Sequence, residues 1–240
     1  MKSAMRSALL ILLAPAAFAA TTIATIGDSL ADGIYLGMKL QPDMLKANDI
    51  RLIRWSRSNV GLTRTDQTDY AAWIRDTADL GSADFCLVHM GANDLQGIPA
   101  GNNKWLSVGT DAWQKAYAER VKTFVEMLKA ERCRSVIWLL QAAYEKNKYL
   151  SQYRGMLNSL QFGSSAAAVA ATFDLATSEN DYGADGIHFS QTFYFSVARA
   201  VIHLFDAWKP FASPVCSACH PAAKYFPAGA GEPLIQHSGQ

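Results

Sequence analysis

The sequence predicts a three-layer α/β/α sandwich, with helices on both faces of a mostly parallel five-stranded sheet. Three observations support this fold class. Of the 240 residues, half are hydrophobic and 18% are charged, which is typical of one globular domain with a sizeable core. Five short apolar runs indicate buried strands, and helical segments separate most of them. This alternation favours parallel strands joined by right-handed crossovers.

The predicted strands are short and apolar on both faces, as strands of a parallel sheet are when helices cover both sides. They are Thr21–Gly27, Ile50–Ser56, Ala83–Gly91, Ser135–Ala142 and Ala168–Ala176. In open sheets of this type, ligands bind beyond the carboxyl ends of the strands. We therefore expect the functional residues directly after the strands.

The clearest predicted helix spans Asp111–Arg132, where apolar side chains recur at steps of three and four residues and form one buried face. These side chains are Trp113, Tyr117, Val121, Phe124, Val125 and Leu128. The other predicted helices are Leu30–Leu40, Tyr70–Leu80, Tyr149–Leu160 and Gln191–Trp208. Ser190 is a candidate N-cap for the last of these helices.

Residues 1–20 are typical of a cleaved signal peptide. Two basic residues, Lys2 and Arg6, precede a short apolar run, and residues 17–19 have the small-x-small pattern of a cleavage site. The run is too short to span a ~30 Å hydrocarbon core, and no later stretch approaches ~20 apolar residues, so we expect no integral membrane span. The sequence predicts a periplasmic or secreted protein with its main domain over residues 21–210.

The charge balance indicates no nucleic-acid partner. The whole chain has 22 basic and 21 acidic residues, and removal of residues 1–20 takes away two of the basic ones. No basic cluster that would favour nucleic acid or an anionic surface is present in what remains.

Four short motifs lie where the predicted fold has the rim of its sheet. They are Gly27-Asp28-Ser29-Leu30, Ser58-Asn59-Val60-Gly61, Gly91-Ala92-Asn93-Asp94 and Asp185-Gly186-Ile187-His188. Each alone is a weak signal, because capping serines, turn glycines and surface histidines are common. Together, in this order, they resemble the SGNH (GDSL) hydrolase family. The resemblance covers residues 27–188 and implies a flavodoxin-like SGNH hydrolase fold and the hydrolysis of ester bonds.

Ser29 is the candidate nucleophile, since it stands at a turn from strand to helix where unpaired N–H groups favour developing negative charge. His188 can accept the serine proton near neutral pH and return it to a leaving alkoxide. Asp185, three residues earlier, can reach the far ring nitrogen and fix the tautomer of the imidazole. These residues predict a Ser-His-Asp triad.

The resemblance also implies an oxyanion hole made by the backbone N–H groups of Ser29 and Gly61 and the side-chain amide of Asn93. A residue without a β-carbon lets the backbone approach the substrate closely, and an amide donates a hydrogen bond without carrying charge. We interpret Asp28 and Asp94 as turn and capping carboxylates that hold these loops.

A closer resemblance is to a poorly characterised exported branch of the family. It depends on Gly91–Gln96, followed by a polar loop and then by Trp113, Tyr117, Arg120 and Val121. Many family members have proline after the histidine, whereas Phe189 and Ser190 follow it here.

These observations predict an exported serine esterase that removes O-acyl groups, acetyl first, from a carbohydrate such as an exopolysaccharide or cell-wall glycan. Trp105 and Tyr182, on loops near Asn93 and His188, are candidate substrate-binding side chains that stack on sugars, although loop aromatics are more often simple packing. Two alternatives use the same residues. One is a lipase, lysophospholipase or thioesterase, and the other is a periplasmic acyl-transfer or glycan-binding protein.

The tail, residues 211–240, is rich in Pro, Ala, Gly and Ser and is expected on the surface or partly disordered. Cys216, Cys219 and His220 have the spacing that attaches c-type haem. Little chain follows, and no methionine occurs after Met156 to act as a second axial ligand. We therefore favour a disulfide between the two cysteines or a pair of exposed thiols, and we expect no cofactor and no metal.

Several other cysteines, histidines and large side chains lie within or next to apolar runs and are expected to pack in the core. They are Cys86, Cys133, His89, His203, Met90, Trp55, Trp73 and Trp138. For the two cysteines this means buried thiols.

Overall fold

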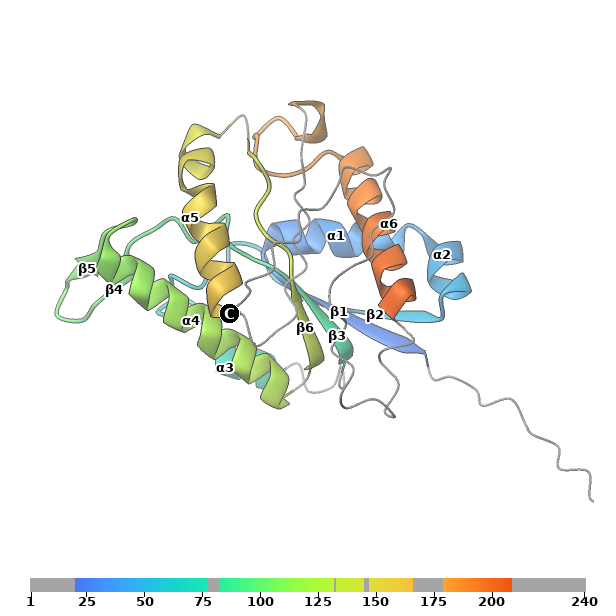
Figure 1. Ribbon diagram of the computed structural model, residues 1–240, viewed down its shortest axis with the longest axis horizontal. Helices are drawn as coiled ribbons and strands as arrows, with labels where there is room; N and C mark the ends of the chain where they lie inside the picture. Colours follow the sequence, from blue (N-terminus) through green and yellow to red (C-terminus); the bar gives the residue numbers. More distant parts are fainter. Residues whose placement is uncertain (1–19, 77–82, 132, 145–146, 166–178, 209–240) are drawn as a thin grey trace, which may run out of the picture.

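The computed structural model describes residues 20–76, 83–131, 133–144, 147–165 and 179–208. Within these ranges, a parallel sheet of four strands lies between helices on both faces (Figure 1). The predicted fold class, an α/β fold with a mostly parallel sheet, is confirmed. The fifth predicted strand, Ala168–Ala176, lies outside the described residues, and so do residues 1–19 of the predicted signal peptide and the tail with Cys216, Cys219 and His220.

The strand order in the sheet is β2-β1-β3-β6. The strands are β1 (Thr21–Gly27), β2 (Ile50–Ser56), β3 (Ala83–His89) and β6 (Cys133–Trp138). The first two have the predicted bounds, β3 ends two residues early, and β6 is shifted toward the N-terminus. Gly27 pairs with Ser56 on one side and with His89 on the other, so β1, β2 and β3 end at one level. The first three rim motifs begin at this level or within two residues of it.

Six helices are described. They are α1 (Ser29–Lys39), α2 (Pro42–Ala47), α3 (Tyr70–Asp76), α4 (Asp111–Glu131), α5 (Lys148–Ser164) and α6 (Gln191–Trp208), with a 3-10 turn η2 at Glu179–Asp181. Helices α1 and α6 pack together on one face of the sheet, and α4 packs with α3 and α5 on the other (Figure 1). None of the helices in the described ranges has the length and apolar character that crossing a membrane requires.

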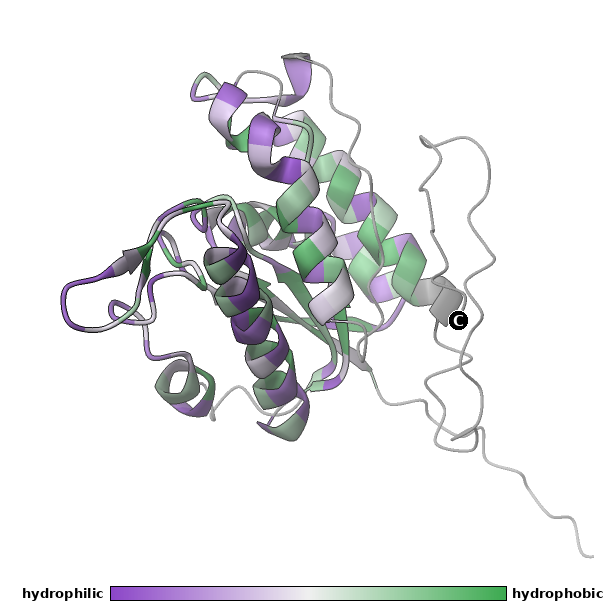
Figure 2. Cartoon of the chain, turned by 60° about the vertical axis from the view of Figure 1, so that its left-hand side comes forward, coloured by the Kyte–Doolittle hydropathy of each residue, from purple (hydrophilic) through white to green (hydrophobic). Residues whose placement is uncertain are grey.

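The region between β3 and α4 contains a small antiparallel hairpin of β4 (Ile98–Pro99) and β5 (Trp105–Leu106), where the sequence indicates only a polar loop. The apolar stripe of α4 is buried as predicted, and Figure 2 shows the contrast between the hydrophobic strands and the hydrophilic outer side of this helix. The Oγ atom of Ser190 accepts the N–H of Phe193 at 3.3 Å, which confirms Ser190 as a cap of α6.

The prediction of buried thiols at Cys86 and Cys133 is wrong. Both side chains are buried, but they form a disulfide between the neighbouring strands β3 and β6, with Cα atoms 5.6 Å apart. An apolar sequence context indicates burial and says nothing about which strands become neighbours. The bond therefore depends on the strand order, which local sequence does not encode.

His203 also departs from its prediction, because it is exposed on α6 although its neighbours Ile202 and Leu204 are buried. Successive side chains of a helix rotate by about 100°, so one residue inside an apolar run can face outward. His89 is buried, as predicted, and so are Met90, Trp55 and Trp138, while Trp73 is partly buried.

Candidate active site

Ser29 is the first residue of α1 and stands on a turn that is built for close packing. Asp28 is the N-cap of α1, as predicted, and its Oδ1 accepts the N–H of Leu30 at 2.9 Å. Gly27 has φ +142°, and a β-carbon there would lie 1.9 Å from the carbonyl oxygen of His89. Only glycine fits this position. The turn consequently holds the Ser29 hydroxyl at the N-terminus of a helix.

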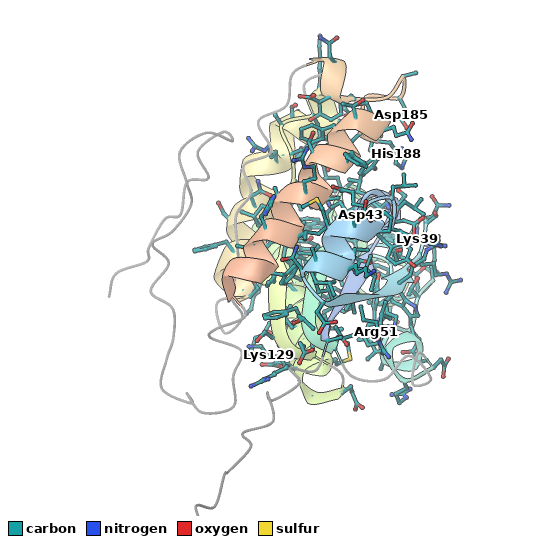
Figure 3. All side chains as sticks on the ribbon, turned by 90° about the vertical axis from the view of Figure 1, so that its right-hand side faces the viewer. Lys39, Asp43, Arg51, Lys129, Asp185 and His188 are labelled. Carbon is teal, nitrogen blue, oxygen red and sulfur yellow. A yellow bond between two sulfur atoms is a disulfide. The ribbon has the colours of Figure 1, made fainter. Side chains whose placement is uncertain are left out.

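The structure brings His188 to Ser29 across 159 positions of sequence. The Nε2 atom of His188 lies 2.8 Å from Ser29 Oγ, and its Nδ1 lies 2.5 Å from Asp185 Oδ2. The other carboxylate oxygen of Asp185 accepts the N–H groups of Ile187 and His188, each at 2.9 Å. Figure 3 shows Asp185 and His188 next to one another on the loop that precedes α6.

The charge state of Asp185 suits a carboxylate beside an imidazole. Slight burial acts to raise its pKa, but the hydrogen bonds from the His188 ring and from the N–H groups of Ile187 and His188 outweigh this effect and hold the pKa below its ordinary value. Asp185 is therefore ionised at neutral pH and can stabilise a positive charge on the ring.

A short antiparallel contact supports the loop that carries His188. Tyr182 pairs with Phe189 as an isolated bridge, and the N–H of Gly183 donates to the carbonyl of His188 at 2.7 Å. The ring of Phe189 packs against Phe193 of α6 with 4.9 Å between ring centroids. The His188 and Asp185 side chains are nevertheless 44% and 49% exposed. The serine and histidine thus meet at a surface that substrate can reach.

The two other predicted oxyanion donors lie on loops that contact each other. The Nδ2 group of Asn93 donates one hydrogen bond to the carbonyl of Val60, at 3.1 Å, which leaves its second N–H for another acceptor. A β-carbon at Gly61 would lie 2.4 Å from Asp94 Oδ1. The tight approach of the two loops explains why this position is glycine.

Asp28 and Asp94 are both fully buried, next in sequence to Ser29 and Asn93. Burial raises the pKa of Asp28 to about 7, with repulsion from Asp94 adding to the effect, and burial also raises the pKa of Asp94 to about 6. Asp94 holds its loops as predicted, but it does so as a bridge and not as a helix cap. It accepts the N–H of Thr63 at 3.2 Å and the hydroxyl of Tyr117 at 2.8 Å.

The two predicted sugar-stacking residues differ in their surroundings. Trp105 on β5 is 53% exposed, and the guanidinium carbon of Arg64 lies 5.4 Å from the centre of its ring. Tyr182 is buried, and its hydroxyl accepts the N–H of Tyr144 at 2.7 Å. The prediction that Tyr182 stacks on sugar is therefore wrong, because its ring packs against Tyr144 and Phe189.

Sequence reasoning missed the buried amides beneath the third motif. The side chains of Gln141 and Gln161 both donate to the carbonyl of Met90, at 2.7 Å and 2.8 Å, and both lie where a β-carbon on Gly91 would point. The sequence feature that could have indicated this contact is a glutamine, Gln141, inside an apolar run. In the described ranges, no cluster of three or more His, Cys, Asp or Glu side chains is arranged to hold a metal.

The fold described above, a parallel sheet between helices, is shared with solved structures of SGNH hydrolases and esterases. A protein assigned to the SGNH hydrolases from Slackia heliotrinireducens superposes with a TM-score of 0.54 at 17% identity, covering 78% of this chain and 99% of that one. The sequence itself shows the family to which the chain belongs. The chain belongs to DUF459, described as a family of unknown function, whose sequence profile matches residues 22–204.

Two further solved structures share this fold. Est24, a carbohydrate acetylesterase from Sinorhizobium meliloti, has a TM-score of 0.54 at 13% identity over 78% of this chain and 99% of its own. The acetyl xylan esterase AlAXEase has a TM-score of 0.51 at 14% identity over 76% of this chain and 98% of its own. Among curated proteins, none matches the sequence.

Proposed function

We propose that this protein is an exported serine esterase that hydrolyses O-acyl esters, acetyl esters first, on a carbohydrate. The observation that carries the proposal is the chain of contacts from Ser29 Oγ to His188 Nε2, at 2.8 Å, and from His188 Nδ1 to Asp185 Oδ2, at 2.5 Å. These are hydrogen-bonding distances for a nucleophile, a general base and the group that orients the base.

In the first half of the reaction, Ser29 Oγ attacks the acyl carbon while His188 Nε2 takes the serine proton. Asp185 accepts a hydrogen bond from Nδ1–H, which keeps Nε2 free to act as the base and stabilises the imidazolium. The carbonyl oxygen becomes an oxyanion, and the N–H groups of Ser29 and Gly61 and the Asn93 amide donate to it. When the C–O bond to the alcohol breaks, His188 returns its proton to the leaving alkoxide.

In the second half, water attacks the acyl-serine. His188 takes a proton from the water as its oxygen bonds to the acyl carbon, and the same oxyanion donors stabilise the second tetrahedral intermediate. The bond to Ser29 Oγ then breaks, and the serine recovers its proton from His188. The products are the carboxylic acid and the free enzyme.

Two features support export and a carbohydrate substrate. Structural disulfides form in oxidising compartments, and a buried Cys86–Cys133 bond agrees with the signal-like pattern of residues 1–20. The relatives in fold include enzymes described as a carbohydrate acetylesterase and an acetyl xylan esterase. Acetylated glycans are found in the periplasm and outside the cell, where an exported enzyme would meet them. We therefore take them as the substrate class.

The test uses the mature chain, residues 21–240, with p-nitrophenyl acetate and a fluorophosphonate probe. We expect hydrolysis of the ester, and labelling at Ser29 when the labelled peptide is mapped by mass spectrometry. Ser29→Ala should lose both. The matched control is Ser159→Ala, since Ser159 is an exposed serine on α5, outside the four motifs, and its loss should change neither. Labelling at another residue, or full activity in Ser29→Ala, would refute the proposal.

The substrate class is tested separately by measuring acetate release from acetylated xylan and from O-acetylated peptidoglycan. We expect Trp105→Ala to lower kcat/KM on a polymer by a few-fold, as for the loss of one exposed stacking contact, and to leave p-nitrophenyl acetate unaffected. A preference for long-chain esters over acetyl esters would instead favour the lipase alternative.

A further inference from the structure

One motif of the sequence is not used by the proposed chemistry. Trp113, Tyr117 and Arg120 are spaced by four and three residues, so they project from one side of α4. Trp113 Nε1 donates to the carbonyl of Gln96 at 2.8 Å, and the Tyr117 hydroxyl donates to Asp94 Oδ2 at 2.8 Å. Two turns of α4 thus hold the loop that follows Asn93.

Arg120 reaches the other donor loop. Its Nη1 donates to the carbonyls of Leu62 and Thr63, at 2.7 Å and 2.6 Å, directly after Gly61. The same loop is held from two more directions, because Asp94 Oδ1 accepts the N–H of Thr63 and the Tyr70 hydroxyl donates to the carbonyl of Gly61. Helix α4 therefore contacts both loops on which the proposed oxyanion donors lie.

We propose that Arg120, Tyr117 and Asp94 form a brace that fixes the Gly61 N–H and the Asn93 amide relative to one another, with Arg120 as its main positioning residue. The kinetic consequence rests on the proposed function, but the positioning itself does not. No member of the brace is required to touch the substrate.

The physical reason is that oxyanion donors act through fixed geometry. A misplacement of about 1 Å can cost ~10²-fold in rate, and the donors must already be in place when the charge forms. The apolar face of α4 is fully buried against the core, so the helix is a rigid reference for the loops. Hydrogen bonds from a guanidinium are charge-assisted, and one Arg120 nitrogen binds two successive carbonyls.

The variants are Arg120→Met, which keeps the apolar stem, and Arg120→Lys, which keeps the charge. Lysine is a single point charge and not a planar fork, so it should restore only part of the function. Lys122→Met is the matched control, because Lys122 is exposed on the same helix. With p-nitrophenyl acetate, we expect Arg120→Met to lower kcat by ~10–100-fold with little change in KM. The kcat of Arg120→Lys should lie between those of Arg120→Met and the wild type, and the kcat of Lys122→Met should equal that of the wild type.

A double-mutant cycle with Asn93→Ala separates positioning from a general loss of stability. Removing one oxyanion donor typically costs ~10²–10³-fold. If Arg120 acts through the donors, Arg120→Met added to Asn93→Ala should cost no more than about 3-fold further, because the two changes affect one unit. Losses that multiply in full would overturn the inference.

Amide hydrogen exchange tests the brace without any turnover. In Arg120→Met, peptides that cover residues 57–64 and 91–96 should exchange at least several-fold faster, while peptides from β1 and β3 stay unchanged; Lys122→Met should show no difference. Unchanged exchange of both loops would overturn the brace even in an active esterase. Faster exchange in a protein that fluorophosphonate does not label at Ser29 would support the brace and refute the proposed function.

Discussion

The two sides of the serine–histidine contact rest on different kinds of support. On one side, Ser29 follows a turn in which Asp28 is fully buried and Gly27 packs against the backbone of β3. On the other side, Asp185 and His188 are about half exposed on a loop held by an isolated bridge and a few hydrogen bonds. The position of the nucleophile is set by the sheet, and that of the base by local contacts.

The difference indicates how the two sides respond to substitution. A change in the serine turn disturbs packing that the whole sheet shares, so it should appear in the free energy of unfolding. A change in the half-exposed histidine loop removes little buried surface, so it should appear in the rate. Four variants test this division, in order of decreasing effect.

Asp185→Asn should produce the largest change in rate. Asparagine keeps the oxygen that accepts the N–H groups of Ile187 and His188, but its amide no longer accepts from Nδ1–H and favours the wrong tautomer. We expect kcat for p-nitrophenyl acetate to fall by ~10⁴-fold, as is typical when the triad carboxylate is lost. The free energy of unfolding in urea should change by no more than ~0.5 kcal/mol.

Asp43→Asn is the control for this measurement, because Asp43 is an exposed aspartate on α2. It should change neither quantity. A loss of stability in Asp185→Asn as large as the loss in a core variant would contradict the division between the two sides.

Gly27→Ala should produce the largest change in stability. The added β-carbon would lie 1.9 Å from the carbonyl oxygen of His89, and φ +142° is unfavourable for alanine. Because backbone must move, we expect a loss of about 3 kcal/mol or more in the free energy of unfolding. Urea titration followed by circular dichroism measures it.

The control is the same substitution at Gly155 in α5, where a β-carbon meets nothing within 4 Å. Gly155→Ala should stabilise the protein by roughly 0.5–1 kcal/mol, since alanine is the better helix former. Equal effects at the two glycines would show that the serine turn is not constrained by β3.

Local patterns in the sequence predicted most of the elements that carry the site. The apolar runs of β1 and β2 and the span of α6 have the predicted bounds, because uninterrupted apolar runs and a capping serine are local signals. The pairing of Ser29 with His188 was expected from the family resemblance of the four motifs together, because His188 precedes a helix and no strand end places it.

What could not be predicted depends on contacts between distant segments. The Cys86–Cys133 bond requires that β3 and β6 be neighbours, and the burial of Tyr182 requires its pairing with Phe189. Neither the strand order nor an isolated bridge leaves a periodic pattern in the sequence. The bridging role of Asp94 was missed for the same reason, because its partners come from two other segments.

The disulfide between β3 and β6 provides a third, smaller test, since it lies within the sheet and not at the rim. Replacing both Cys86 and Cys133 by alanine should lower the free energy of unfolding by ~2–4 kcal/mol, the range typical of native disulfides. At a temperature where the variant stays folded, kcat for p-nitrophenyl acetate should remain within about 2-fold of the wild type, as expected for a stability effect distant from the chemistry. A large loss of rate in the folded variant would mean that the sheet transmits strain to the rim.

Asp28→Asn tests the electrostatic side of the buried serine turn. The folded-state pKa of Asp28 is raised to about 7 by burial, above its ordinary value of 3.8. Between these values the native state holds a proton that the unfolded chain has lost, so this group makes stability fall as pH rises from about 4 to about 7. Asparagine can still accept the N–H of Leu30 but has no charge to bury, so it removes this dependence.

The measurement is the free energy of unfolding in urea at pH 4.5 and pH 7.5 for wild type and Asp28→Asn. The variant should gain stability relative to the wild type between the two pH values by on the order of 3 kcal/mol, given about 1.4 kcal/mol per pKa unit. Burial lowers the pKa of His89 to about 4, but His89 is present in both proteins and cancels in the difference. Asp94 repels ionised Asp28 in the wild type only, so its ionisation adds to the difference in the same direction. Any cost of burying the new amide is the same at both pH values and cancels too. A difference between the two proteins that does not change with pH would mean that Asp28 is already ionised in the folded state, and that the serine turn is rigid through packing alone.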